Sequence, residues 1–245
     1  MPEKEKIREM FDSIAPEYDA FNHLTSMNFD RRWRRKALKY IRGPKVLDIA
    51  CGTGDFSITI ARHFEKLYGS HPVSDAEKDW SVTGADISSG MLAQMREKVA
   101  AAGLEGRVSA EIGDCCDLHY SSGRFDSVTV AFGVRNFKDR AQALQDILRV
   151  LKPGGRFVML ELGMPQGRLA GGIFKFYFTR IMPLIGGKMS HNREAYRYLP
   201  ASVIAFPGKD EWTAFMQEAG FQNVIHKALT LGICRLYVGE KKSAV

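Results

Sequence analysis

The sequence lacks the features of a membrane-spanning, secreted or metal-clustered protein. No apolar run reaches the roughly 18 residues that a membrane-spanning helix needs, because the best candidate, at 173–187, is interrupted by Lys175, Arg180 and Pro183. The four cysteines form no CxxC pair and have no histidine at zinc-ligand spacing, so we expect reduced thiols. The first residues alternate acid and base, unlike a secretory or transit peptide. We therefore predict a cytoplasmic protein without a bound metal.

The composition is that of an ordinary globular chain with an excess of positive charge. Its 245 residues are 45% hydrophobic and 26% charged, which is enough to bury one substantial core. The formal net charge of +7 is compatible with binding to nucleic acid, with binding to an anionic membrane surface, or with solubility alone. The charge is densest at Arg31–Lys36, around Trp33. This run is typical of a solvent-exposed helix face. The alternative with a functional role is a basic face that contacts phospholipid head groups.

Short β-branched runs alternate with longer segments of helical period between residues 45 and 162. Such alternation predicts a parallel sheet with helices on both faces, and ligands at the carboxyl ends of the strands. The last two predicted strands are joined by a short connection, which requires antiparallel pairing. We therefore predict an α/β fold, a doubly wound, seven-stranded, mostly parallel sheet with a final antiparallel strand. The predicted strands are 45–50, 81–87, 107–114, 125–133, 156–162, 221–229 and 232–241, and the predicted helices of this part are 56–67, 89–103, 139–155 and 209–220.

One domain is predicted, with four parts. Residues 1–43 form an N-terminal helical cap, 44–163 the α/β core with the ligand site, and 209–245 a C-terminal helix and strand pair. The segment 164–208 is rich in aromatic residues and punctuated by glycines, and it lacks the alternation of the core. It is typical of a lid inserted after the fifth strand, although part of it could belong to the hydrophobic core. Residues 68–79 are interpreted as a surface insertion.

The turn after the first predicted strand has the pattern of a ligand-binding loop. The stretch VLDIACGTGDF, at 46–56, places Asp48 before Gly52, Thr53 and Gly54. Glycines let a ligand approach the backbone, and the amides of the following helix face outward. The motif is weak by itself, because a tight turn without any ligand has the same pattern.

Acidic residues follow two further strands and strengthen this interpretation. Asp86 ends the second strand, where a carboxylate can accept both hydroxyls of a ribose, and Asp114 follows the third, in position for an adenine amino group. Cys115 and Ala131, at the ends of the third and fourth strands, complete the predicted contacts. Acids in these positions suit S-adenosylmethionine, which carries a sulfonium and an ammonium group. A dinucleotide such as NAD would call for a third glycine, so we predict S-adenosylmethionine as the cofactor.

Six stretches together resemble the menaquinone/ubiquinone biosynthesis C-methyltransferase family, which has the Rossmann-like methyltransferase fold. The resemblance covers nearly the whole chain; AFGVRN is its most discriminating element, whereas LKPGG is widespread among methyltransferases. The chain departs from the family pattern at Phe21, Asp30 and Gly163, which concerns the lid more than the chemistry. The six stretches are YDAFNHLTSMNFDRRW (18–33), LDIACGTGDF (47–56), AFGVRNFKD (131–139), RVLKPGGRFVMLEL (149–162), YRYLPASVIAFPG (196–208) and the closing GF…LGI…LYVGEK.

The resemblance implies methylation of a ring carbon of a prenylated hydroquinone. The product would be menaquinol from demethylmenaquinol, or the matching intermediate toward ubiquinol. It also implies that Arg135 and Asn136 are catalytic, with Arg135 stabilising the ionised phenol directly or through a water molecule. A guanidinium stays protonated in proteins, so Arg135 is not expected to act as a base. An ion pair with Asp139 or another local acid is its alternative role.

The remaining site predictions concern the substrate. Tyr18, Phe132, Arg135 and Tyr196 are predicted to contact it, and His191 on the lid is a further candidate for moving the phenolic proton. A structural tyrosine and a surface histidine are the plainer interpretations of Tyr18 and His191.

The partners follow from the substrate. An aromatic lid beside a basic cluster suggests a passage for an isoprenoid tail and peripheral contact with membrane lipid. A methyltransferase of nucleic acid is a competing hypothesis, but the sequence contains no N-P-P-Y or D-P-P-Y tetrad, and we predict no nucleic-acid partner. A non-catalytic quinone-binding protein is a further hypothesis, but the predicted cofactor-binding acids Asp48, Asp86 and Asp114 are all present, which argues against it. A homodimer is left open.

Overall fold

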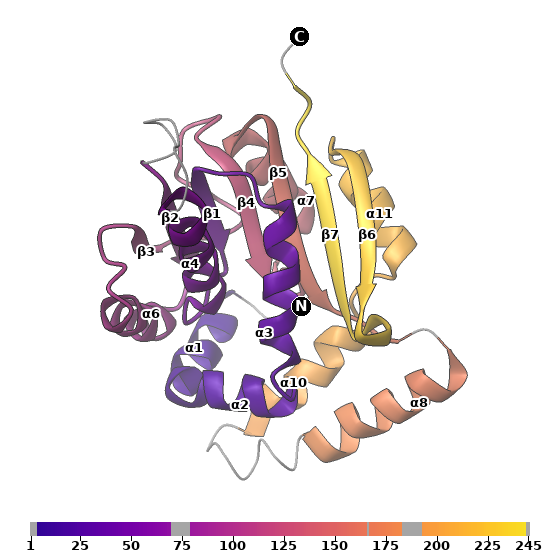
Figure 1. Cartoon of the computed structure of the whole chain (residues 1–245). Coiled ribbons are helices and arrows are strands. Elements are labelled where there is room, and N and C mark those ends of the chain that lie inside the picture. The colour runs from indigo at the N-terminus through magenta and orange to yellow at the C-terminus, as the bar shows by residue number, and fades with distance from the viewer. Residues whose placement is uncertain (1–3, 70–78, 166, 183–192, 244–245) are drawn as a thin grey trace.

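A computed structural model describes residues 4–69, 79–165, 167–182 and 193–243. These residues form one seven-stranded sheet with the order β3-β2-β1-β4-β5-β7-β6 (Figure 1). Strand β7 runs antiparallel to its neighbours β5 and β6, and the other neighbouring strands are parallel. The predicted doubly wound, mostly parallel sheet is therefore confirmed. The strands are β1 (Lys45–Ile49), β2 (Ser81–Asp86), β3 (Val108–Ile112), β4 (Phe125–Ala131), β5 (Leu151–Leu162), β6 (Gln222–Leu229) and β7 (Cys234–Glu240).

Strand β1 lies in the interior of the sheet, between β2 and β4. Its Leu47 lies between Thr83 of β2 and Val128 of β4. Because helices cover both faces there, the strand is a nearly continuous apolar run rather than an alternating one. The strand order reverses between β1 and β4, so the carboxyl ends of these two strands diverge around a crevice.

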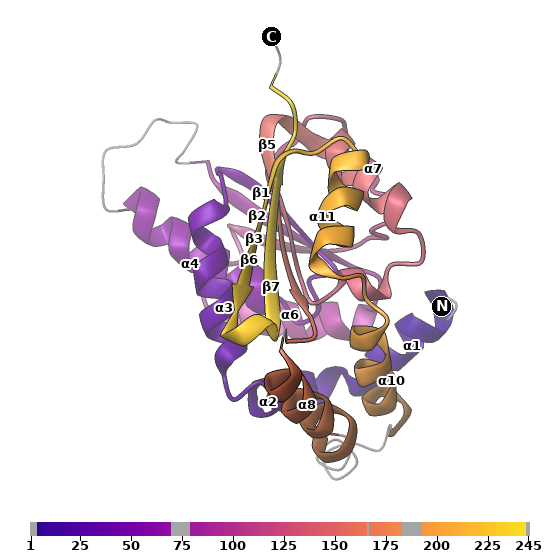
Figure 2. The ribbon, with the colours of Figure 1, turned by 90° about the vertical axis from the view of Figure 1, so that its right-hand side faces the viewer.

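Helices cover both faces of the sheet and one end of it. Figure 2 shows α3 and α4 on one face and α7 and α11 on the other, while α1, α2, α8 and α10 gather at the end toward which β4 points in Figure 1. Two of these helices begin at a capping side chain: Ser88 caps α6 by accepting from the Met91 amide, and Asp139 caps α7 by accepting from the Gln142 amide. The helices are α1 (Lys4–Ile14), α2 (Tyr18–Thr25), α3 (Phe29–Ala37), α4 (Asp55–Gly69), α6 (Ser89–Ala101), α7 (Arg140–Val150), α8 (Arg168–Phe176), α10 (Arg193–Ile204) and α11 (Lys209–Glu218); short helical turns lie at η1 (Ala15–Glu17), η2 (Leu38–Tyr40), η3 (Val134–Asn136), η4 (Tyr177–Ile181) and η5 (Thr230–Gly232).

Hydrophobic side chains form a separate core on each side of the sheet. Phe157 and Trp212 belong to the core under α7 and α11, and Phe64 and Met95 to the core under α3, α4 and α6. A smaller cluster, which includes Phe178, joins α2 to α8 and α10. This third cluster lies beyond the strand ends and forms part of the wall of the site.

The predicted helix 139–155 is wrong at its C-terminal end, because β5 already begins at Leu151. Pro153 has no amide hydrogen to donate to a helix, and Gly154 has a φ of +73°. The stretch LKPGG therefore leaves α7 in an extended conformation and joins the sheet early. Within the described residues, no helix combines the length and the apolar character needed to cross a bilayer.

The first prediction concerns the core under α7 and α11. Phe157 is fully buried and packs on Phe221 with a ring-centroid distance of 5.6 Å. We expect Phe157→Ala to lower the free energy of unfolding by about 3–5 kcal/mol, because it leaves a cavity. The control is Phe176→Ala, whose side chain is 62% exposed and which should change stability by less than about 0.5 kcal/mol. Urea denaturation measures both values, and similar effects of the two substitutions would contradict the described core.

Candidate functional site

Two cavities lie side by side at the carboxyl ends of the strands. The strand-end cavity, of about 930 Å³, is bordered by the ends of β2, β3 and β4 and by α1. The aromatic cavity, of about 900 Å³, is bordered by α1, α2, α3, α8 and α10. Both volumes include the part that is open to solvent. The shared border consists of Phe11, Tyr18 and Phe132.

The strand-end cavity brings together most of the predicted cofactor residues. Gly52, Asp86, Asp114, Cys115 and Ala131 all line it. Sequence analysis missed the residues that α1 and α6 contribute. They are Lys4, Ile7, Phe11 and Met91. The apolar residues of α1 lie on one face of the helix, but this pattern does not show which part of the protein that face packs against.

Asp86 holds the glycine turn against the end of β2. Its two carboxylate oxygens accept hydrogen bonds from the amides of Gly52 and Ser88, each at 2.9 Å. Burial raises the pKa of Asp86 above its ordinary value, and the nearby Asp12 adds to the effect. Each carboxylate oxygen has two lone pairs, so the group can still accept from a ligand hydroxyl.

Asp114 follows β3, the strand next to β2, and is paired with α1. Its carboxylate is 2.5 Å from Nζ of Lys4 and accepts from the Cys116 amide at 2.9 Å. Partial burial opposes ionisation, but the bonds from Lys4 and Cys116 outweigh it, so the pKa of Asp114 is lowered. The Lys4–Asp114 pair therefore closes α1 over this cavity.

Three of the predicted residues, in or before the glycine turn, do not line the strand-end cavity. Asp48 is fully buried and accepts hydrogen bonds from Ser57 at 2.6 Å and Thr129 at 2.7 Å. Thr53 is buried and bonds to Asp19. Gly54 has a φ of +80°, and a Cβ there would lie 2.5 Å from Met95. Asp48 and Thr53 instead line a smaller adjoining cavity of about 350 Å³.

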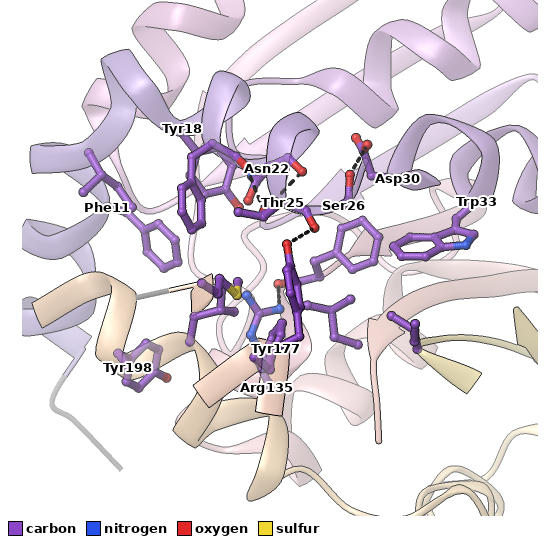
Figure 3. Close-up of a pocket in the computed structure, with 18 of the residues that line it drawn as sticks. Phe11, Tyr18, Asn22, Thr25, Ser26, Asp30, Trp33, Arg135, Tyr177 and Tyr198 are labelled. Atoms are coloured by element: carbon purple, nitrogen blue, oxygen red, sulfur yellow. Dashed lines mark hydrogen bonds between the residues drawn. The ribbon is translucent and has the colours of Figure 1, made fainter. Parts of the chain in front are cut away.

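Aromatic rings form a large part of the wall of the aromatic cavity, and Arg135 lies among them (Figure 3). Arg135 is only 7% exposed. Burying a guanidinium among apolar side chains is unfavourable unless an anion pairs with it. The rings come from Phe11, Tyr18, Phe21, Trp33, Phe132, Phe174, Tyr177, Phe178 and Tyr198.

The partner of Arg135 is Glu161, at the end of β5. The Nη1 atom of Arg135 is 2.8 Å from Oε1 of Glu161, and the Arg135 amide donates to Oε2 at 3.1 Å. Glu161 is fully buried. The ion pair considered as the alternative role therefore exists, although with Glu161 rather than with Asp139. The Nε atom of Arg135 is buried and has no hydrogen-bond partner among the described residues.

Asn136 lines the strand-end cavity, while Arg135 beside it lines the aromatic cavity. The Oδ1 atom of Asn136 accepts a hydrogen bond of 2.9 Å from the hydroxyl of Tyr198 on α10. Sequence analysis proposed Tyr196 and His191 on this segment, but the Tyr196 side chain and His191 lie outside the described residues. Sequence analysis missed Tyr198 because Tyr196 and Tyr198 are the same residue type. Only the orientation of α10 determines which residues of this helix line the site.

A cluster of His23, Asp30 and Asp55 beside the site has donor atoms close enough to suggest a metal. Two cations already pair with its carboxylates. Arg34 is 2.5 Å from Asp30 and 3.2 Å from Asp55, and Lys98 is 2.5 Å from Asp55. This charge balance favours an ion-pair network over a metal centre.

The buried Asp48 generates a prediction about pH. Burial raises its pKa to about 6, from an ordinary value of 3.8, although Ser57 and Thr129 donate to it. The native state therefore holds a proton that the unfolded state releases at lower pH, and this contribution to stability is lost as the pH rises from about 4 to above 6. A shift of about two units corresponds to roughly 3 kcal/mol.

Asp48→Asn removes this titration. We expect the stability of the variant relative to the wild type to increase by about 2–3 kcal/mol between pH 4 and pH 7. Urea denaturation at a series of pH values measures the difference. Parallel stability curves for the two proteins would show that Asp48 has an ordinary pKa in the fold.

Curated relatives of the chain are quinone-biosynthesis enzymes. The ubiquinone/menaquinone biosynthesis C-methyltransferase UbiE of Geobacter sulfurreducens is 48% identical over 240 residues, covering 97% of this chain and 89% of the relative. The demethylmenaquinone methyltransferase of Thermus thermophilus is 43% identical, covering 95% of this chain and 100% of the relative. That of Bacteroides fragilis is 38% identical, covering 97% and 93%.

Solved structures show the same fold at low sequence identity. The [4+2]-cyclase SpnF is similar with a TM-score of 0.63 and 15% identity, covering 99% of this chain and 98% of the other. A SAM-dependent methyltransferase from Aquifex aeolicus has a TM-score of 0.58 and 16% identity, covering 85% and 89%. The family model of the ubiE/COQ5 methyltransferases matches residues 1–241. The chain is therefore a methyltransferase that belongs to the ubiE/COQ5 methyltransferase family.

Proposed function

We propose that the chain transfers the methyl group of S-adenosylmethionine to a ring carbon of a prenylated hydroquinone, converting demethylmenaquinol to menaquinol. The observation that carries this proposal is the shared border of the two cavities. Only Phe11, Tyr18 and Phe132 border both the acid-lined strand-end cavity and the aromatic cavity within the described residues. A methyl donor and a ring held on the two sides of this border would be close enough to react.

The strand-end cavity fits a cationic adenosine derivative. Asp86 keeps free lone pairs next to the glycine turn, and Asp114, after the neighbouring strand, offers a second carboxylate to the cavity. We assign the ribose hydroxyls to Asp86 and the adenine side to Asp114 and Cys115. Gly52 and Ala131 would contact the remainder, Thr53 and Gly54 complete the turn, and Asp48 supports it through Ser57 and Thr129. When bound, S-adenosylmethionine would supply an electrophilic methyl group: the S–CH3 bond would break as the new C–C bond forms, S-adenosylhomocysteine would leave, and the ring proton would pass to water.

Arg135 is assigned to the phenol oxygen of the substrate. Its guanidinium lines the aromatic cavity, and its buried Nε has no partner among the described residues, so a donor remains for a ligand. A fixed positive charge stabilises the phenolate and so raises the electron density of the adjacent ring carbon. Glu161 holds the guanidinium in place. Asn136, fixed by Tyr198, faces the strand-end cavity and would align the reacting groups.

The rest of the aromatic cavity suits an isoprenoid tail. Phe174, Tyr177 and Phe178 line it from α8 and η4, and the hydroxyl of Tyr177 donates to the Thr25 carbonyl at 3.0 Å, which joins η4 to α2. The relatives named for menaquinone support a naphthoquinol ring over a benzoquinol ring. Because such a substrate resides in the bilayer, we place the protein in the cytoplasm, in peripheral contact with the inner face of the membrane. A homodimer stays a prediction.

The direct test of the function is methyl transfer in detergent micelles. We expect radiolabel from S-adenosylmethionine to appear in menaquinol when demethylmenaquinol is supplied, at a higher kcat/KM than with a demethylated ubiquinol precursor. Label in RNA but not in quinol would contradict the proposal, and equal rates with both quinols would contradict the choice of ring.

Arg135→Lys tests the catalytic assignment. Lysine keeps the charge that pairs with Glu161 but loses the planar fork, so we expect kcat to fall about 100-fold or more while the Kd of S-adenosylmethionine changes less than about threefold. Calorimetry and initial rates measure the two quantities. Arg124→Lys, at an exposed position outside both cavities, is the matched control and should leave both unchanged. Equal losses of turnover and of cofactor affinity would show that Arg135 is misassigned.

A further inference from the structure

A third concavity, the basic groove, lies between α3 and α4, outside the two cavities of the site. Its volume is about 1170 Å³, including its open side. Asp55 is the one acidic side chain that lines it within the described residues. Two histidines, His23 and His63, also line it. The cationic side chains of the groove are Arg31, Arg34, Arg35, Arg62, Lys66 and Lys98.

Ion pairs neutralise part of the charge of the groove, including that of Arg62, which is 2.7 Å from Glu65. Arg34 and Lys98 pair with Asp55 at 3.2 and 2.5 Å. By contrast, Arg31 and Arg35 are exposed and have no ion-pair partner among the described residues. The groove therefore presents an excess of positive charge toward solvent.

The surroundings of His63 agree with this excess. Partial burial lowers the pKa of His63, and the charge of Lys66 lowers it further. A nearby anion would have the opposite effect on the imidazole. The groove thus carries a positive potential that an anionic ligand would relieve.

The structure divides the basic run of α3 into two faces. Arg31 and Arg35, four residues apart, line the basic groove, whereas Arg32 and Lys36 are also exposed but do not line it. Trp33, between them, is buried in the core. In the sequence these basic residues form one cluster. The packing of α3 on the sheet divides the cluster into residues that line the groove and residues that do not.

The groove begins on α2, a helix that also lines the aromatic cavity and that, with the loop after it, carries exposed apolar side chains. His23 of α2 lines the groove, and the next residues of this helix and its loop include Leu24, 54% exposed, and Met27, 71% exposed. Helix α2 also lines the aromatic cavity through Phe21 and Thr25. Exposed apolar side chains of this size next to unpaired cations are typical of a surface that rests on a lipid bilayer.

We propose that the basic groove binds the phosphodiester head group of an anionic phospholipid, with Arg31 and Arg35 as its main ligands and Leu24 and Met27 entering the acyl region. The proposal rests on the proposed function in one respect: the prenylated substrate would then reach the aromatic cavity from the membrane against which α2 lies. The groove itself takes no part in methyl transfer.

The experiment compares two double variants that remove the same charge from the same helix. Arg31→Gln/Arg35→Gln changes the groove, and Arg32→Gln/Lys36→Gln is the matched control. The probes are vesicles of phosphatidylglycerol and phosphatidylcholine in equal parts, and vesicles of phosphatidylcholine alone. Affinity for the mixed vesicles should fall about tenfold or more in the groove variant, on the order of 1 kcal/mol for each cation, and less than about threefold in the control.

Further arms separate the groove from other sources of attraction. The wild type should bind phosphatidylcholine vesicles at least about tenfold more weakly than the mixed vesicles. Equal losses in the two double variants would reveal diffuse attraction by net charge and overturn the proposal. Equal binding of the wild type to the two kinds of vesicle would also overturn the proposal. The same holds if the groove binds pyrophosphate or an RNA oligonucleotide but no vesicles.

Methylation in detergent micelles keeps this proposal distinct from the proposed function. Both double variants should retain wild-type turnover there, and thermal unfolding should confirm that both are folded. A wild type that binds the mixed vesicles but methylates no quinol would contradict the proposed function and leave the groove intact. A wild type that methylates quinol but shows no groove-dependent binding would contradict only the groove.

Discussion

Both cavities depend on the ion-pair network that fixes the N-terminal helices to the first turn of the sheet. Lys98 on α6 is 2.6 Å from Asp19 on α2 and 2.5 Å from Asp55 at the start of α4, and Arg34 on α3 joins the same carboxylate. These groups are partly buried, and ion pairs in such positions are screened less than on the surface. Because Tyr18 stands next to Asp19 on α2, the network also fixes the border that the two cavities share.

The two cavities separate opposite chemical requirements. The strand-end cavity collects carboxylates that suit a cationic donor, and the aromatic cavity offers rings that suit an apolar tail. A guanidinium in the second cavity is tolerable only because Glu161 pairs with it from the end of β5. The carboxyl edge of a parallel sheet makes this division possible, since neighbouring strands deliver different side chains to adjacent points.

Much of the fold was predictable because it rests on local patterns. The alternation of apolar strands and amphipathic helices predicted the sheet, and the short connection before β7 predicted its antiparallel end. The start of β5 was missed because the pairing that draws Leu151 next to Phe125 is a long-range contact. Glu161 was missed as the partner of Arg135 for the same reason: 26 residues separate them along the chain, and neither residue type indicates the other.

The sequence by itself determined the order of the elements, the acids at the strand ends and the AFGVRN motif, since each of these is a property of neighbouring residues. Only the tertiary structure decided which of these residues share a cavity. Asp48 lies buried outside the strand-end cavity, whereas Asp86 lines it. Arg31 and Arg35 line the basic groove, whereas Arg32 and Lys36 do not. The physical reason is that packing sets the orientation of each helix and strand, and spacing along one segment says nothing about the surface that the segment packs against.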